Sequence, residues 1–396
     1  MIHLRPIGRA ALLLALVWLS GCDDGGVGAA TDRAEAAAES GNLAAARAAV
    51  EQAVTLAERK YGADHPKVAL ALTRAGETYL SQGDHAEAEP AFKRALAIRE
   101  RAYKSTHGLV ATSLNNLGLV YRLTGRAAEA EPLIKRAIAI DEQTWRPPLD
   151  HLSVGLNNLA EVYRVLGRHA EAEPLYRRAL ELSERVLGRD HPSTGVVLNN
   201  LALLYRAQGQ FDRAEPMLKR ALAIDEKAGG ADHPDVAVAL YNLASLHRAQ
   251  DRPAEARALL ERTLAIQEKQ LGLDHPRLRT VLTALGDTYR DLDRPGDAEF
   301  PYRRAIALGE KALGPADPAL ADPLTGLALA EALQGRWAPA EAILRRAADI
   351  TASDPAELVP ILNILEVVLR NQGRTAEADA VEAQASGLAA KELLKK

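Results

Sequence analysis

The sequence predicts an all-α solenoid of about nine helix pairs, and two observations carry that prediction. The first is a repeat of 42 residues, seen in glycines at constant spacing: Gly41, Gly83, Gly125, Gly167 and Gly209. Tyrosines and prolines follow the same period, and self-similarity at one period indicates a stack of like units. The second is composition. Only 4% of the 396 residues are aromatic, so Ala and Leu must form the core between closely approaching helices.

Each unit divides into two helices and a loop. In residues 108–145 the first helix is marked by apolar residues three or four apart: Leu114, Leu117, Val120 and Tyr121. Gly125 ends this helix, because glycine tolerates the positive φ found there. A second apolar face follows at Ala130, Ile134, Ala137 and Ile138. Four loops between units read Asp-His-Pro, and proline suits the first turn of the helix that comes next.

The first 22 residues have the organisation of an export signal. A basic start with Arg5 and Arg9 precedes an apolar core at 10–19, which is half the length of a membrane-spanning helix. Residues 19–22 then read LSGC, which resembles the lipobox of bacterial lipoprotein precursors. The resemblance implies a signal peptide at 1–21, lipidation of Cys22 and membrane anchoring in the bacterial cell envelope, outside the cytoplasm. The alternative is an ordinary secretory signal cut nearby.

Cys22 is the only cysteine in the chain, so a disulfide within the chain, a cysteine-based zinc finger and a CxxC redox site are excluded. Asp23 and Asp24 follow it directly, which resembles an inner-membrane retention signal of some bacteria. Residues 22–30 are rich in glycine and alanine and are predicted to be a flexible tether.

The pattern formed by Leu114, Leu117, Gly118, Tyr121, Ala130, Ile134 and Ala137 resembles the tetratricopeptide (TPR) repeat. The 42-residue period and the Asp-His-Pro loop are similar to the longer subclass found in kinesin light chain and many bacterial proteins. The resemblance covers about residues 28–385. It implies a right-handed superhelical solenoid over 31–395, with the first helix of each unit on the concave surface. The end repeats, about 28–61 and 354–395, are degenerate, as expected of capping repeats.

Polar residues recur on the face of the first helices that core packing does not need. They form asparagine and arginine columns: Asn115, Asn116, Asn157, Asn158, Asn199, Asn200, Asn242, Arg122, Arg164, Arg206, Arg248 and Arg290. An Asn amide can pair with a peptide backbone, and Arg offers forked donors to carboxylates. We therefore interpret these residues as a peptide-binding groove centred on Asn158, Asn200, Arg164 and Arg206. In the alternative interpretation, the asparagines join neighbouring first helices and the arginines pair with local acids.

Other charged residues point to structure rather than chemistry. Basic pairs recur on the second helices, each with an acid four residues earlier, which is a favourable order on a helix surface. The histidines of successive loops are spaced too widely to share one metal ion: His65, His107, His151, His191, His233 and His275. The formal charge of −4 does not suggest nucleic-acid binding. No phosphate loop, HExxH or GxSxG motif is present, so no catalytic residue, cofactor or small-molecule substrate is expected.

Three functional hypotheses follow from the sequence. The leading one is a non-enzymatic, lipid-anchored solenoid that holds an extended, partly acidic segment of an unidentified partner protein. The second is a structural scaffold or spacer in an envelope complex, with no peptide in its groove. The third is a cell-envelope hydrolase whose site is assembled from scattered residues. In each case contact with the membrane is through the lipid anchor only.

Overall fold

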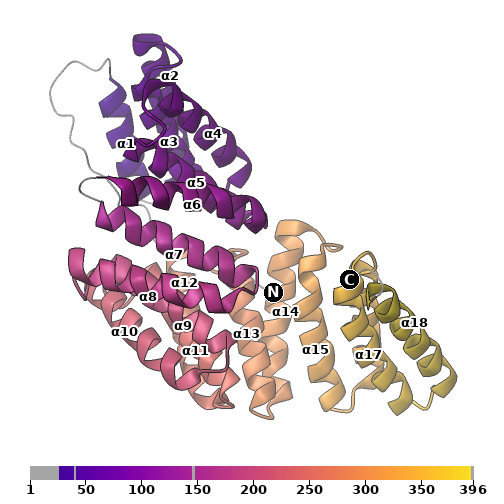
Figure 1. Ribbon diagram of the computed structural model, residues 1–396. Coiled ribbons are helices and arrows are strands. Elements are labelled where there is room, and N and C mark those ends of the chain that lie inside the picture. Colours follow the sequence, from indigo (N-terminus) through magenta and orange to yellow (C-terminus); the bar gives the residue numbers. More distant parts are fainter. Residues whose placement is uncertain (1–25, 40–41, 145–147, 394–396) are drawn as a thin grey trace. The chain divides into compact units, whose positions relative to one another are not determined.

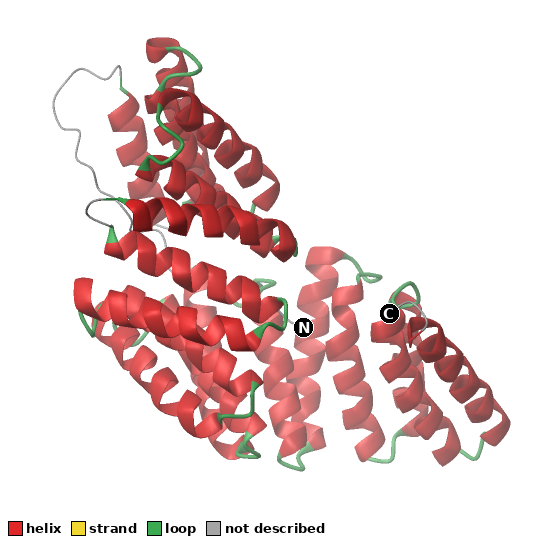
Figure 2. Ribbon diagram, viewed as in Figure 1, coloured by secondary structure: helices red, strands yellow, loops and turns green. Residues whose placement is uncertain are grey.

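A computed structural model describes residues 26–39, 42–144 and 148–393. These residues form eighteen α-helices and one short 3-10 helix, and no β-strand lies among them (Figure 2). The helices follow one another as nine consecutive pairs (Figure 1). The predicted all-α class and the number of helix pairs are therefore confirmed. The chain divides into two compact units, with the boundary between Ile224 and Asp225 inside α10.

The first unit contains five helix pairs, the last of which includes most of α10. Their bounds are α1 Val27–Glu39, α2 Leu43–Tyr61, α3 Pro66–Gln82, α4 His85–Ala102, α5 Gly108–Leu123, α6 Ala127–Gln143, α7 Leu149–Val165, α8 His169–Val186, α9 Pro192–Ala207 and α10 Phe211–Gly229. The predicted tether at 22–30 is too long, because residues 27–30 already belong to α1. The predicted signal peptide and Cys22 lie outside the described residues.

The second unit contains four helix pairs. They are α11 Pro234–Ala249, α12 Pro253–Leu271, α13 Leu278–Asp291, α14 Pro295–Leu313, α15 Ala321–Leu333, α16 Trp337–Ile350, α17 Pro355–Asn371 and α18 Thr375–Leu393. The 3-10 helix, Pro318–Leu320, leads into α15. Within this unit each first helix contacts the next, α13 with α15 and α15 with α17. Residues on the inner face of these first helices therefore form one continuous surface.

Histidine precedes the first helix in five repeats. His65 Nδ1 accepts a hydrogen bond from the Lys67 backbone N–H at 3.1 Å. The same bond recurs at His107, His191, His233 and His275, with distances of 3.2–3.3 Å. An acceptor at this position satisfies a backbone donor that the helix itself leaves open. Four of these histidines cap a first helix, and His275 makes the same bond in the turn just before α13. His151 differs from the predicted loop position, because it lies inside α7.

A residue with positive φ ends each first helix from α3 onward. It is glycine in most repeats, for example Gly125 with φ 81°. Asp251 and Asp293 replace glycine with φ of 58° and 56°. Aspartate is one of the few residues with a side chain that tolerates this conformation. The two aspartates therefore keep the turn, and with it the register of the repeat.

Small residues let the two helices of a pair approach closely. A Cβ atom added to Gly118 of α5 would lie 2.5 Å from Ile134 Cγ1 of α6 and 3.5 Å from the Ala130 carbonyl oxygen. The same close approach occurs where Gly286 of α13 faces the Tyr302 ring. The two helices of this pair therefore cross closely at Gly118 and Ala130. Ala and Leu make up most of the buried core, as the composition predicted.

Seven arginines on the second helices fasten each repeat to the one before it. Each pairs with a glutamate 36 residues earlier: Arg94–Glu58, Arg136–Glu100, Arg178–Glu142, Arg220–Glu184, Arg262–Glu226, Arg304–Glu268 and Arg346–Glu310. Five of them also donate to a carbonyl of the preceding loop, as Arg220 does to Arg189 at 2.7 Å. Six of these arginines follow a basic residue that makes instead the predicted local pair, such as Lys219–Glu215 at 2.8 Å. Arg262 follows Glu261, which pairs with Arg257.

This difference predicts unequal effects of two adjacent substitutions on α10. Arg220→Met removes a bridge to Glu184 and to the Arg189 carbonyl, so the free energy of unfolding should fall by about 1–2 kcal/mol. Lys219→Met removes only an exposed local pair and should cost no more than about 0.5 kcal/mol. Urea unfolding followed by circular dichroism measures both. Equal losses for the two variants would show that the inter-repeat pair adds no stability.

Candidate interaction surface on the first helices

The structure pairs the two asparagine columns with each other. Asn158 Nδ2 of α7 donates to Asn115 Oδ1 of α5 at 3.1 Å, and Asn200 Nδ2 of α9 donates to Asn157 Oδ1 of α7 at 3.0 Å. In these two repeats the second asparagine thus reaches the first asparagine of the preceding repeat. Adjacent first helices of the first unit are joined by these amide bonds.

Burial limits what these amides can offer to a partner. Asn157 and Asn158 are only 7% and 8% exposed. The remaining asparagines of the two columns are half-buried: Asn115, Asn116, Asn199, Asn200 and Asn242. Both observations favour the alternative interpretation for Asn158 and Asn200, in which the asparagines join neighbouring repeats. The half-buried members still present polar atoms to the inner face.

The first two arginines of the column converge on one buried carboxylate, Glu161 of α7. Arg164 donates from Nε to Glu161 Oε1 at 2.8 Å and from Nη2 to Oε2 at 3.0 Å. Arg122, on the preceding first helix, places Nη1 3.5 Å from Oε2. Tyr176 of α8 donates its hydroxyl to Oε1. We call these four side chains the Glu161 cluster.

The electrostatics of this cluster favour its ionised form. Burial alone would raise the pKa of Glu161, but the hydrogen bond and charge of Arg164 and the charge of Arg122 outweigh it and lower the pKa to about 2. Burial and the adjacent carboxylate raise the pKa of Tyr176, which therefore stays a neutral donor. Two guanidinium groups share one carboxylate, so the cluster carries a net positive charge. Arg122 and Arg164 keep 12% and 23% of their side-chain surface exposed.

The same arrangement recurs in the second unit around Asp287 of α13. Arg248 Nη1 lies 3.2 Å from Asp287 Oδ2, and the Tyr302 hydroxyl donates to Oδ1 at 2.6 Å. Arg290 Nη2 is farther away, at 3.8 Å. Arg248 also pairs with Asp291 at 2.8 Å. The residue spacings match those of the Glu161 cluster, but two acids balance the two arginines here.

Arg206 of α9 is half-buried and lies in the same column. Leu203 stands in its helix where α7 has Glu161. The predicted centre of the groove is therefore not uniform. Asn158 and Asn200 bridge adjacent helices, and Arg164 is bound to Glu161. Arg206 has a leucine, not an acid, three residues before it in its helix.

Sequence reasoning missed an apolar inner face at the C-terminal end of the second unit. Leu333 of α15 is 59% exposed, Val367 of α17 is 51% exposed, and Leu329 of α15 is partly buried. Leu329 and Val367 each stand six residues before the positive-φ glycine that follows their helix, Gly335 and Gly373. Glu161 has the same place relative to Gly167. Counting back from the glycine that ends each first helix would have revealed these apolar residues in the sequence. The 42-residue period alone does not, because Gly373 follows Gly335 after only 38 residues.

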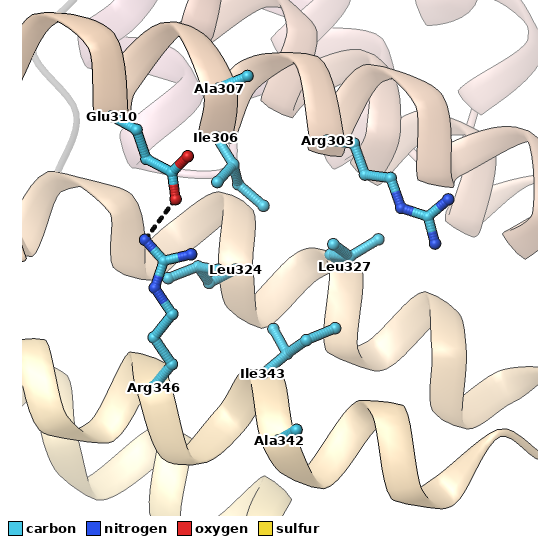
Figure 3. A pocket seen from close by; sticks show the side chains of 9 residues that line it. All are labelled: Arg303, Ile306, Ala307, Glu310, Leu324, Leu327, Ala342, Ile343 and Arg346. Atoms are coloured by element: carbon cyan, nitrogen blue, oxygen red, sulfur yellow. Dashed lines mark ion pairs between the residues drawn. The ribbon is translucent and has the colours of Figure 1, made fainter. Parts of the chain in front are cut away.

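A separate cavity lies between the second helices α14 and α16, over α15 (Figure 3). Its volume is about 310 Å³, and its floor is formed by Ile306, Leu324, Leu327 and Ile343. At one edge Glu310 and Arg346 pair with each other at 2.6 Å, as one of the seven inter-repeat bridges. The residues that line the cavity include no serine, cysteine or histidine. The arrangement supplies apolar contact but no nucleophile.

The described residues show no sign of two other kinds of site. Within residues 26–39, 42–144 and 148–393, no three His, Cys, Asp or Glu side chains come together in a way that could hold a metal ion. The helices of that same part of the chain include none that is long and apolar enough to cross a membrane.

The fold defines a helical-repeat protein built of consecutive antiparallel helix pairs. The tetratricopeptide repeat family matches residues 27–101, 73–143, 152–227, 199–269 and 235–311, which together span more than half of the sequence. The chain belongs to the tetratricopeptide repeat family. A comparison with curated proteins finds no match.

Two solved structures show the same fold, and a third shares more of the sequence. The apo form of the quorum sensor NprR from B. thuringiensis has a TM-score of 0.65 at 16% identity, covering 91% of this chain and 98% of that one. A Rap protein complexed with competence and sporulation factor gives 0.62 at 14% identity, covering 94% and 100%. TPR-like repeats of a putative kinesin light chain from Podosopora anserina share 28% identity, with a TM-score of 0.42 and coverage of 52% and 98%.

The asparagine bridges predict a loss of stability on truncation. Asn158→Ala removes the bond to Asn115 between α7 and α5, so the free energy of unfolding should fall by about 1 kcal/mol. Asn116→Ala is the matched control, because the structure gives Asn116 no amide bridge within the described residues. Thermal and urea unfolding of both variants measure the difference. An unchanged Asn158→Ala variant would contradict the bridging role.

The Glu161 cluster predicts a pH-dependent contribution to stability. The pKa of Glu161 is lowered from 4.5 to about 2 on folding, so its stabilising effect is complete above pH 4.5 and is lost as the pH falls through 2. Glu161→Gln leaves two partly buried guanidinium groups without their counter-ion and should cost about 3 kcal/mol at neutral pH.

The difference in unfolding free energy between wild type and Glu161→Gln should therefore narrow between pH 4.5 and pH 2. Urea unfolding across this range measures it. The exposed Glu181 of α8 offers a control, since Glu181→Gln should show no such convergence. A gap that stays constant with pH would mean that Glu161 is not ionised by its neighbours.

Proposed function

We propose that the protein is a lipid-anchored interaction module outside the cytoplasm, and that it holds an extended, partly acidic segment of a partner protein along the inner face of its first helices. The observation that carries the proposal is the net positive charge of the Glu161 cluster. Two arginines from successive first helices, Arg122 and Arg164, share one carboxylate there. An acidic segment supplies the missing negative charge without displacing Glu161.

The solved structures support this proposal by analogy of fold. One of them is a quorum sensor and another is a Rap protein in complex with competence and sporulation factor. Their sequence identity to this chain is low, so the residues that contact their ligands do not transfer. What transfers as a hypothesis is that a TPR solenoid of this size uses its inner face to bind another molecule.

The asparagines have a changed role within this proposal. Asn115, Asn157, Asn158 and Asn200 set the spacing of adjacent first helices through their bridges. They thereby fix the distance between successive arginines, while the half-buried amides remain close to any segment that lies along the face. This assignment also favours the second candidate function, a structural scaffold, because the same bridges stiffen the stack with no ligand bound.

The anchor is the second part of the proposal. Helix α1 begins at Val27, five residues after Cys22. A lipidated Cys22 would therefore hold the first repeat within about 18 Å of its attachment point, the reach of five extended residues. The solenoid would lie close to the membrane surface, and its partner would be a protein found there.

The lipobox predicts the effect of Cys22→Ser. The variant should either be released from membranes or keep its signal peptide uncleaved, because both processing and anchoring need the thiol. Membrane fractionation and gel migration measure the two outcomes, with Ser20→Ala as a conservative control in the same motif. Fractionation and migration like those of the wild type would exclude the lipoprotein interpretation and favour an ordinary secretory signal.

Site-specific photo-crosslinking tests the groove. A photoreactive residue at Val196 lies one helical turn before Asn200 and on the same face of α9. It should capture a partner in native membranes, and capture should weaken as salt is added, because an acidic segment is held by screened charges. A photoreactive residue at Lys219 on the second helix α10 is the control. Capture from Lys219 alone would support the scaffold and exclude the groove.

A further inference from the structure

The second helices of the first unit carry a column of buried polar residues near their C-terminal ends. The column follows the 42-residue period and includes Arg99 of α4, Asp141 of α6 and Ser183 of α8. All three are at most 5% exposed. A polar group that is enclosed in this way destabilises the folded state unless it forms hydrogen bonds. Each member of the column therefore needs a partner nearby.

Two of the three members have a partner on the first helix that follows. Arg99 donates from Nη1 to Ser113 Oγ of α5 at 2.6 Å. The hydroxyls of Ser183 and Thr194, on α8 and α9, are hydrogen-bonded to each other at 2.7 Å. Both bonds are buried, and each joins a second helix to the first helix of the next repeat. The seams between α4 and α5 and between α8 and α9 are therefore each fastened by a polar contact.

Asp141 stands between these two members of the column and lacks the matching donor. Its Oδ1 is buried and accepts no hydrogen bond from the described residues. Where α5 has Ser113, α7 has Gly155, and where α9 has Thr194, α7 has Leu152. Neither position of α7 offers a hydroxyl. The seam between α6 and α7 thus encloses a carboxyl group with an unsatisfied oxygen.

The same seam also lacks a helix cap. Within the described part of the chain no side chain caps α7, which begins after Pro148, whereas His107 caps α5 and His191 caps α9. Helices α6 and α7 are nevertheless in direct contact (Figure 1). A Cβ atom added to Gly155 would lie 3.2 Å from Ile138 Cγ1, one turn before Asp141. Two polar contacts of the neighbouring seams are therefore missing from one that is closely packed.

The charged groups of α7 do not compensate for this enclosure. Burial is the main cause that raises the pKa of Asp141 from its ordinary 3.8 to about 6. A positive charge on His151 acts against burial, and the carboxylate of Asp150 raises the pKa further. Both residues lie near the start of α7. The closed seam therefore favours the neutral form of the Asp141 carboxyl.

The other helices around α6 supply no counter-ion for this carboxyl. Helix α5 has no acid or base between residues 108 and 118, which lie along the C-terminal half of α6. Charged groups of α4 and α8 are engaged in bridges to other residues of α6, and the histidine before α5 holds a backbone N–H: Glu100–Arg136, Arg178–Glu142 and His107.

We propose that Asp141 is a pH-sensitive joint between the third and fourth helix pairs. While its carboxyl is neutral, the seam between α6 and α7 stays closed. When the carboxyl loses its proton to water, a charge is enclosed beside an unsatisfied oxygen, and the seam opens locally so that water reaches it. Acidification closes the joint. Because α5 carries Arg122 and α7 carries Glu161, opening of the joint also changes the distance between these two inner-face residues.

The direction of the pH dependence follows from proton binding. Opening returns the Asp141 carboxyl to its ordinary pKa of 3.8, whereas closure holds the pKa at about 6. The closed seam therefore loses stability as the pH rises from 3.8 to 6, and the loss stays constant above that range. With these two values the open population rises roughly tenfold between pH 5 and pH 7.5.

Hydrogen–deuterium exchange of the full chain, followed by mass spectrometry, measures opening in peptides from the last turns of α6 and the first turns of α7. The reference is Asp141→Asn, which keeps the shape of the side chain and stays neutral. Comparison at one pH cancels the intrinsic pH dependence of exchange. The ratio of wild-type to variant exchange rates should rise roughly tenfold from pH 5 to pH 7.5 and then level off. Asp141→Leu, also uncharged, is a second reference with the same expected ratio.

Glu129→Gln is the matched control, because Glu129 is an exposed acid in the first turn of the same helix. Its exchange relative to wild type should not change with pH. The column contains a second acid, Asp225 of α10, which is half-buried and precedes a helix capped by His233. Asp225 is present in every one of these proteins, so its titration cancels from the ratios.

A ratio that stays constant or falls as the pH rises would overturn the inference, because ionised Asp141 would then not destabilise the closed seam. A ratio that rises equally in peptides from α3 would overturn it too, since ionisation would then loosen the whole unit. A rise confined to the region of α6 and α7 supports the joint. None of these results depends on a lipid anchor or on a bound partner, so the proposed function is tested separately.

Discussion

A helix pair of this repeat cannot bury its apolar surface alone, and that constraint shapes the rest of the structure. Each pair has one face against its own partner helix and another that only the next repeat can cover. Glycine and alanine make the first contact close, as at Gly118 against Ile134. The second contact needs correct register between repeats, which apolar side chains alone specify weakly. Polar bridges supply the register: arginine to glutamate on the second helices, and asparagine to asparagine on the first.

This use of polar groups changes how the inner face is interpreted. A periodic column of asparagine and arginine suggests a ladder for a peptide backbone. In the first unit the buried amides instead join α5, α7 and α9, and Glu161 holds two arginines. A side chain that is buried and bonded gives less to a ligand, because binding would first break a bond that is already made. What remains for recognition is the residual charge of such clusters, together with surfaces that carry no bridges.

The sequence was sufficient for the architecture, because the repeat makes each element visible several times over. The glycine turns, the histidine caps and the local Glu–Lys pairs all recur at the period, and Asp251 and Asp293 could be placed as glycine substitutes. The site was harder to predict. The bond from Asn158 to Asn115 joins two different columns, 43 residues apart, so no single column reveals it. Tyr176 completes the Glu161 cluster from another helix. Tyr302 recurs in the same column, 126 residues later, but most other members of that column are apolar core residues, so the hydroxyl's role was not evident. The apolar face was hidden because the last repeat is four residues short, which moves Val367 out of frame with Leu329.

Fastening and recognition therefore compete for the same inner surface. Arg164 is already bound to Glu161, at 2.8 and 3.0 Å. A partner carboxylate must compete with Glu161 for this arginine, and Glu161 has the advantage because the fold already holds it in place at no further entropic cost. At Arg290 the nearest acid, Asp287, is 3.8 Å away, whereas Arg370 of α17 pairs with Glu366, Asp379 and Glu382. The arginines of the first helices thus differ in how firmly neighbouring acids hold them. An arginine that is held firmly is less available to a partner, because binding would compete with a contact that is already made.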